Sequence, residues 1–166
     1  MPVFNNILAG AAGSGGAADY KIERSLRFNG AGNDDPYLER SVSSAGNRRT
    51  FTFAAWVKND VKTSNYDRIF SAGTSTSNIF DITLLADAEG TGLRIYNNTG
   101  GVNTNWNTAN KLRDPSAWFH VLCSIDTTQS AAANRLKVYI NGTHITQYGT
   151  TNTIPSQNAQ LAVNDA

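Results

Sequence analysis

"RRTFTFAAWVKND", residues 48–60, alternates apolar side chains with other types over most of its length. Phe51, Phe53 and Val57 fall on one side of an extended chain, which is typical of a β-strand packed on a core. The opposite side should face water, yet it carries the large aromatic residue Trp56. This stretch therefore predicts a strand over residues 50–58, and it predicts that something covers Trp56 or that Trp56 binds something.

The same period of two continues along the chain. Apolar residues alternate in segments 67–72, 78–86, 93–97 and 118–126, and Gly, Asn, Asp and Ser gather between them. Segment 135–148 predicts a hairpin, because Asn141-Gly142 provides two residues suited to positive φ in a two-residue turn. Segment 98–117 is polar and is either an edge strand with loops or a functional loop. Strands at this spacing predict an antiparallel sandwich or barrel, without helices.

Size and charge exclude several classes of protein. The chain has 166 residues and a net charge of +1, which suits one domain and demands no anionic partner. No basic run with interleaved aromatic residues predicts nucleic-acid binding, and no apolar stretch reaches the roughly 20 residues of a membrane helix. Cys123 is the only cysteine, so the chain can fold in a reducing cytoplasm, and we expect this side chain to be a buried small hydrophobe.

The first 20 residues differ from the rest. Four apolar side chains precede an Ala/Gly-rich run, namely Val3, Phe4, Ile7 and Leu8. The Gly-rich run cannot form a core, so residues 1–20 are either a free tail or a flexible arm that docks its apolar side chains on a neighbouring protein. We therefore predict two parts, an anchoring arm over 1–20 and a folded domain over 21–166.

The aromatic residues outside the expected core are candidate contact sites. Trp56 and Trp118 lie on outer strand faces by register, so a long loop, a neighbouring subunit or a ligand should cover them. Trp106 is a candidate sugar platform, because aromatic faces and amide hydrogen bonds hold sugars. Its neighbours provide those amides: Asn103, Asn105 and Asn107. The alternative is that Trp106 packs under a loop.

The order of these motifs resembles the concanavalin A-like, laminin G-like jelly-roll family from about Lys21 to the end of the chain. The resembling positions are Leu26, Phe28, Tyr37, Leu38, Phe51, Phe53, Trp56, Val57, Trp118, His120, Val121, Tyr139, Asn141 and Gly142. The resemblance implies an all-β, antiparallel two-sheet jelly roll. In this family further strands usually follow the position of residues 161–166, so the chain is expected to continue or to have its sheet closed by a partner.

The fuller pattern, including residues 1–13, looks like virion structural proteins of tailed bacteriophages. This implies a tail fibre, spike or head-decoration component, located in the virion and joined to other virion proteins and to its own copies, as in trimeric fibres. It also implies contact with host-surface polysaccharide. The alternatives are a structural adaptor without glycan binding and an enzyme acting on polysaccharide.

The sequence contains no clear pattern of catalytic or metal-binding residues. Glucanases of this fold use paired carboxylates, but Asp87 and Glu89 lie in a glycine-rich turn, so we predict no catalytic residues and no enzyme activity. The two histidines have no zinc-site spacing. Some laminin G-like domains hold calcium, for which Asp34, Asp35 and Asp87 are the only candidates, and we predict no metal or cofactor.

Overall fold

A computed structural model provides the structure of the protein, and it describes residues 24–28, 37–58, 66–87, 90–109 and 111–165. The chain divides into two units, Met1–Arg40 and Ser41–Ala166. The described residues of the first unit form no helix or strand and expose large apolar side chains, among them Leu26 and Tyr37. The predicted arm, residues 1–20, lies outside the described residues, so its boundary stays a prediction.

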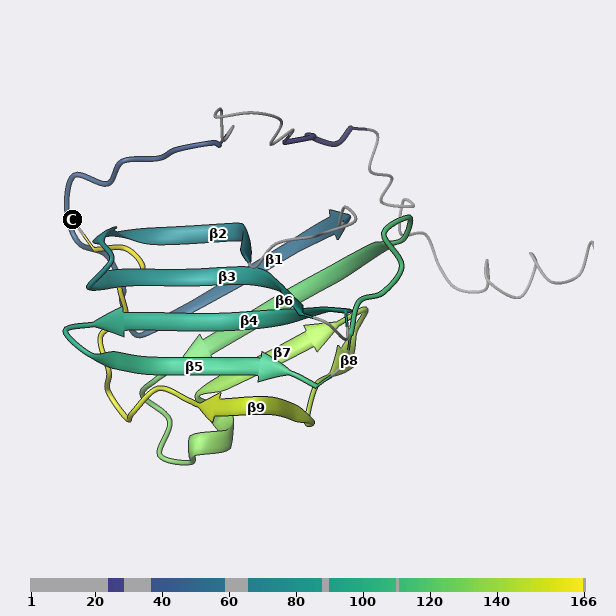
Figure 1. Ribbon diagram of the computed structural model, residues 1–166. Helices are drawn as coiled ribbons and strands as arrows, with labels where there is room; N and C mark the ends of the chain where they lie inside the picture. Colours follow the sequence, from purple (N-terminus) through teal and green to yellow (C-terminus); the bar gives the residue numbers. More distant parts are fainter. Residues whose placement is uncertain (1–23, 29–36, 59–65, 88–89, 110, 166) are drawn as a thin grey trace, which may run out of the picture. The chain divides into compact units, whose positions relative to one another are not determined.

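The second unit is a sandwich of two antiparallel sheets, as the sequence predicts (Figure 1). One sheet has four strands in the order β1-β6-β7-β8, and the other has five in the order β2-β3-β4-β5-β9. A short 3-10 helix, η1 (Ala132–Asn134), precedes β7. Among the described residues no helix has the length and apolarity needed to cross a membrane. The strands are β1 (Thr50–Lys58), β2 (Tyr66–Ser75), β3 (Asn78–Asp87), β4 (Gly90–Thr99), β5 (Val102–Thr108), β6 (Trp118–Asp126), β7 (Leu136–Ile140), β8 (Thr143–His144) and β9 (Tyr148–Thr153).

The core lies between the two sheets and follows the predicted alternation. In β6, Phe119, Val121, Cys123 and Ile125 are buried, whereas the residues between them are partly exposed. The rings of Phe51 in β1 and Phe80 in β3 meet edge to face across the sandwich, with 5.2 Å between their centroids. Such contacts hold the two inner faces together, since buried aromatic pairs stabilise a core beyond the area that they bury.

The predicted hairpin is confirmed at its turn. Asn141 and Gly142 have φ angles of +50° and +77°, and Ile140 pairs with Thr143 across the turn. The polar segment 98–117 differs from the expectation that it is an edge strand with loops or a functional loop. Its central part is β5, which lies between β4 and β9, and β9 occupies the edge. The sequence does not reveal this, because β9 (YGTTNT) has no alternation of apolar and polar residues.

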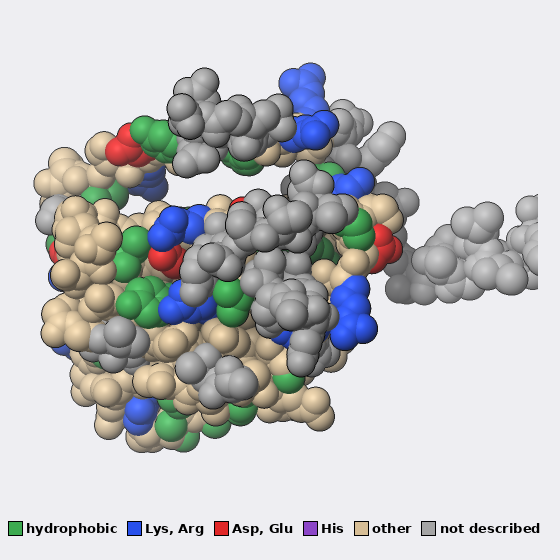
Figure 2. Space-filling view, in the orientation of Figure 1, with side chains coloured by type: hydrophobic (Ala, Val, Ile, Leu, Met, Phe, Trp, Pro, Cys, Tyr) green, Lys and Arg blue, Asp and Glu red, His purple; other side chains and the backbone are tan. Residues whose placement is uncertain are grey.

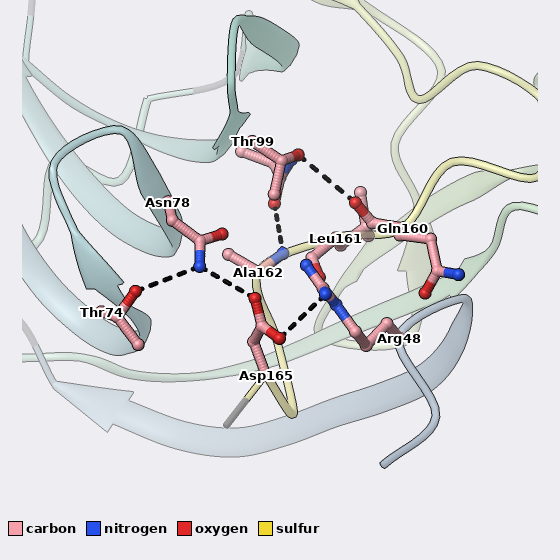
Figure 3. Close-up of polar contacts among 9 residues, drawn as sticks. Arg48, Thr74, Asn78, Thr99, Gln160, Leu161, Ala162 and Asp165 are labelled. Carbon is pink, nitrogen blue, oxygen red and sulfur yellow. Dashed lines mark hydrogen bonds and ion pairs between the residues drawn. The ribbon is translucent and has the colours of Figure 1, made fainter. Parts of the chain in front are cut away.

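The C-terminal segment joins the two sheets (Figure 3). Leu161, Ala162 and Val163 are buried in the core. Beyond them, the carboxylate of Asp165 accepts hydrogen bonds from Arg48 Nη1 and from Asn78 Nδ2, each at 2.8 Å. Arg48 lies just before β1 and Asn78 begins β3, so one carboxylate connects the two layers. The side chains of Arg48 and Asp165 are 20% and 18% exposed, which limits screening by water.

Candidate functional site

The outer face of the four-stranded sheet carries a group of aromatic side chains. Trp56 in β1 and Trp118 in β6 are 50% and 48% exposed, as their register predicts. Trp56 pairs across the strands with His120, and the centroids of their rings are 5.3 Å apart. Trp118 pairs with Lys58. Two tryptophans thus share one solvent-facing surface at the end of the β1–β6 pair.

The aromatic surface continues across the remaining strands. Leu122 in β6 pairs with Tyr139 in β7, and Tyr139 pairs with His144 in β8. The rings of Tyr139 and His144 are 4.9 Å apart. Both histidines of the chain therefore lie on this face. We name the surface the aromatic face and define it by Trp56, Trp118, His120, Tyr139 and His144.

Charged side chains lie toward the two ends of the aromatic face. Lys58 lies at one end, and Lys137 and Asp126 lie toward the other, because Ser124 pairs with Lys137 and Thr50 with Asp126. Hydrogen bonds from Thr128 and Gln129 lower the pKa of Asp126, so this carboxylate is ionised at neutral pH and engaged locally. Half-exposed tryptophans that share one face of a sheet are typical of a surface that contacts another macromolecule.

The outer face of the five-stranded sheet is polar and hollowed. A cavity of about 270 Å³ is lined by a set of residues from β2, β3, β4 and the turn before β3: Arg68, Thr76, Ile79, Asp81, Thr83, Arg94 and Tyr96. We name it the polar groove. Figure 2 shows this side of the molecule, where blue and red side chains lie next to one another over β2, β3 and β4. The groove contains two guanidinium groups and one carboxylate.

The charged side chains of the polar groove are held by specific contacts. Asp81 is 6% exposed, and its carboxylate accepts hydrogen bonds from Ser71 Oγ at 2.6 Å and from Arg68 Nε at 3.3 Å. Arg94 Nε donates to Asn105 Oδ1 at 3.0 Å, and the guanidinium carbon of Arg94 lies 4.3 Å from the centre of the Tyr96 ring. These contacts orient both arginines on the sheet surface.

Two buried polar atoms on this face have no hydrogen-bond partner in the structure. They are Oγ1 of Thr83, a residue that is 2% exposed, and Oδ1 of Asn107. Thr83 pairs with Arg68 on one side and Arg94 on the other, and Arg94 pairs with Asn107. Buried polar atoms ordinarily have a hydrogen-bond partner, and ordered water often provides it.

Trp106 does not lie where a sugar could stack on it. The ring is 2% exposed in the core and meets the ring of Tyr148 at 5.7 Å. The reason is the alternation of β5: Thr104, Trp106 and Thr108 point inward, so Asn105 and Asn107 belong to the outer face. The expectation of an exposed platform at Trp106 is therefore corrected, whereas Asn105 lies against the polar groove through Arg94. The side chain of Asn103 lies outside the described residues.

Of the other candidate residues, the structure describes the side chain of Cys123 but not those of the N-terminal arm or the candidate carboxylates. Cys123 is buried, and burial raises the pKa of its thiol to about 12, so it is a core residue and no nucleophile at neutral pH. The side chains of Val3, Phe4, Ile7, Leu8, Asp34, Asp35, Asp87 and Glu89 lie outside the described residues. In the part of the chain that the structure describes, no three His, Cys, Asp or Glu residues gather as metal ligands do.

Sequence reasoning missed the polar groove for a structural reason. The alternation of β3 places Asp81 and Thr83 on its outer face, where they would ordinarily be exposed. They are buried because long side chains from β2 and β4 lie beside them, as the pairing of Thr83 with Arg68 and Arg94 shows. Strand register creates this neighbourhood, and a single sequence does not specify register.

Comparison with known families supports the observed fold. A laminin G-type family model, described as the Concanavalin A-like lectin/glucanases superfamily, matches residues 31–164. The match covers all strands of the sandwich. Searches of curated proteins and of solved structures returned no match.

Proposed function

Because the chain belongs to the Concanavalin A-like lectin/glucanases superfamily, we propose that it acts as a binding and assembly module rather than an enzyme. In this proposal it is a structural protein of a tailed-phage virion, in a fibre, spike or capsid-associated position. The aromatic face joins it to further copies of itself, and residues 1–20 anchor it to the particle. The virion context rests on the resemblance of the sequence, and the contact surface rests on the structure.

The single observation that carries the assembly role is the exposure of Trp56 and Trp118 on one sheet face. Exposed tryptophan is costly in water and is enriched at the energetic centres of protein interfaces. Copies of this chain are suitable partners, because a net charge of +1 creates little repulsion between them. Charged side chains border the aromatic face, with Lys58 beside Trp118 and Lys137 toward the opposite end, as a polar rim borders an interface core.

Contact with host-surface glycans is a second candidate function, and the polar groove favours it. The groove lies on the other sheet from the aromatic face, so the two functions can coexist in one subunit. Asn105, one of the residues predicted to bind glycans, accepts a hydrogen bond from Arg94, which lines the groove.

The assembly role is tested by the molar mass of the full chain and of two variants, measured by light scattering over a range of concentrations. We expect the unmodified chain to form an oligomer and Trp56→Ala and Trp118→Ala to shift it toward the monomer. The loss should be large, because truncating a tryptophan that is buried in an interface costs about 2 kcal/mol or more of binding free energy.

The matched control is Tyr148→Ala, which removes another partly exposed aromatic residue from the other sheet. It should leave the oligomer intact. A monomeric unmodified chain at all concentrations, or an oligomer unaffected by both tryptophan variants, would contradict the proposed role of the aromatic face.

A further inference from the structure

We infer that β1 pairs edge to edge with β1 of a second copy of this chain, in an antiparallel arrangement centred on Ala54. The pairing joins the two four-stranded sheets into one continuous sheet. It is a contact separate from the aromatic face, because it uses the edge of the sheet rather than its outer surface. The proposed assembly role of the aromatic face can therefore fail without affecting it.

The edge strands of the sandwich differ in how well they are protected against such pairing. Among the described residues, β1 and β8 are the edges of the four-stranded sheet, and β2 and β9 are those of the five-stranded sheet. β8 has only two residues, and register shifts interrupt the pairing of β2 and of β9 with their neighbours. Short length and bulges discourage an edge strand from pairing with another chain. β1 has neither, because it pairs with β6 in one unbroken register over all nine of its residues.

The backbone of β1 presents a row of hydrogen-bonding groups at this edge. Arg49 O accepts a hydrogen bond from Thr127 N at 2.9 Å, which sets the order of bonding between β1 and β6. Because alternate residues of an antiparallel strand bond to opposite sides, the odd-numbered residues of β1 bond to β6. The N–H of Thr50 accordingly donates to Asn47 Oδ1 instead of to β6. The residues whose backbone groups point away from β6 are Thr50, Thr52, Ala54, Trp56 and Lys58.

The inward side chains of β1 also lack cover toward this edge. Phe51, Phe53 and Val57 are only partly buried, whereas the inward residues of β6, one strand further from the edge, are buried. No described strand lies on the other side of β1. A strand added there covers this apolar row and bonds to the backbone groups that point to the edge, which is how an extended segment gains affinity at a sheet edge.

A second copy of β1 fits this edge in a register that uses all nine residues. Ala54 lies at the two-fold axis, where its small side chain meets its own copy. Apolar residues lie opposite each other on the inner face, and no two charges oppose each other on the outer face. The opposed pairs are Phe51–Val57 and Phe53–Ala55 on the inner face, and Thr50–Lys58 and Thr52–Trp56 on the outer face. Because both copies use the same edge, the contact closes at two copies.

The test is air oxidation of two variants of the full chain, Ala54→Cys and Thr52→Cys, followed by non-reducing electrophoresis. Both sites are exposed on the outer face of β1, and the natural Cys123 is buried. In the inferred register the two substituted residues of Ala54→Cys have Cα atoms about 5.5 Å apart, a separation that a disulfide can span. Those of Thr52→Cys are offset by four residues, roughly 13 Å along the strands. We expect a covalent dimer from Ala54→Cys and a monomer from Thr52→Cys.

The control variant shows whether the thiols meet in the inferred register. Equal amounts of dimer from the two cysteine variants would overturn the register, because thiols that meet by random collision do not distinguish the two positions. No covalent dimer from Ala54→Cys would overturn the pairing itself.

Trp118→Ala separates this contact from assembly through the aromatic face. Combined with Ala54→Cys, it should leave cross-linking unchanged, because Trp118 lies on β6 and away from the edge. Loss of cross-linking in the double variant would show that the thiols meet across the aromatic face and would overturn edge pairing. Cross-linking that persists while the tryptophan variants leave the oligomer unaffected would support edge pairing and contradict only the role of the aromatic face.

Ala54→Pro tests the backbone bonds at the edge, with Ala54→Ser as its matched control. Proline removes the N–H of Ala54 that points away from β6 and none that bonds to β6, a position where edge strands tolerate proline. Serine keeps this N–H. In the Trp118→Ala background, we expect light scattering to report a dimer for Ala54→Ser and a monomer for Ala54→Pro. A dimer that persists in the proline variant would overturn the inference.

Discussion

At the scale of single residues, the three tryptophans of the chain have opposite roles. Trp106 is 2% exposed and fills the core, whereas Trp56 and Trp118 are about half exposed on the aromatic face. The sequence predicts the outward position of Trp56 and Trp118, because each alternates with clear core residues in its own strand. Its polar neighbours made Trp106 a plausible surface residue, although Thr104, Trp106 and Thr108 share the period of two that marks an inner face.

These positions predict different effects on stability. Trp106→Ala should lower the free energy of unfolding by about 3–5 kcal/mol, because it removes a large buried ring and leaves a cavity. Trp56→Ala should cost the monomer about 1 kcal/mol or less, because half of its side chain already faces water. Urea unfolding of each variant at a concentration where the chain is monomeric measures both values. Equal destabilisation by the two variants would contradict the assigned positions.

At the scale of elements, the strands with alternating apolar residues could be predicted, but the polar strands and the pairing between strands could not. Strands 118–126 and 50–58 have strong alternation, and their observed bounds match the prediction. β5 and β9 are rich in Asn and Thr, so their strand state depends on pairing with each other and with β4 rather than on an apolar pattern. For the same reason the polar groove, which depends on register between β2, β3 and β4, could not be predicted.

The C-terminal segment is an element without regular structure that contributes to stability through one carboxylate. Asp165 bonds Arg48 and Asn78 from the two layers (Figure 3). We expect a double-mutant cycle of Arg48→Ala and Asp165→Ala to give a coupling of about 1–2 kcal/mol, because both side chains are largely buried and the bond is charge-assisted.

Arg49→Ala is the matched control for this cycle, since Arg49 is the adjacent arginine and is exposed. Its effect on the free energy of unfolding should be small and should add independently to that of Asp165→Ala. A coupling near zero between Arg48 and Asp165 would show that the bond contributes nothing to holding the segment.

At the scale of the whole molecule, the two outer faces of the sandwich differ in chemistry. The four-stranded sheet presents aromatic rings, and the five-stranded sheet presents a charged groove. One face suits burial against a protein, and the other suits a polar, charged ligand. In the proposed function, this division would let the subunit assemble through one sheet and keep the other sheet available to bind a ligand. A single sequence predicts the sandwich and the outward tryptophans, but the difference between the two faces emerges only from strand order.

Hydroxyl-radical footprinting with mass spectrometry tests the central claim, that the aromatic face is an assembly surface, most directly. The full chain is oxidised once when dilute and once when concentrated, and oxidation is compared at each tryptophan. We predict that Trp56 and Trp118 are oxidised in the dilute sample and protected in the concentrated one, with Trp106 protected in both. Equal oxidation of Trp56 and Trp118 at the two concentrations would contradict the claim.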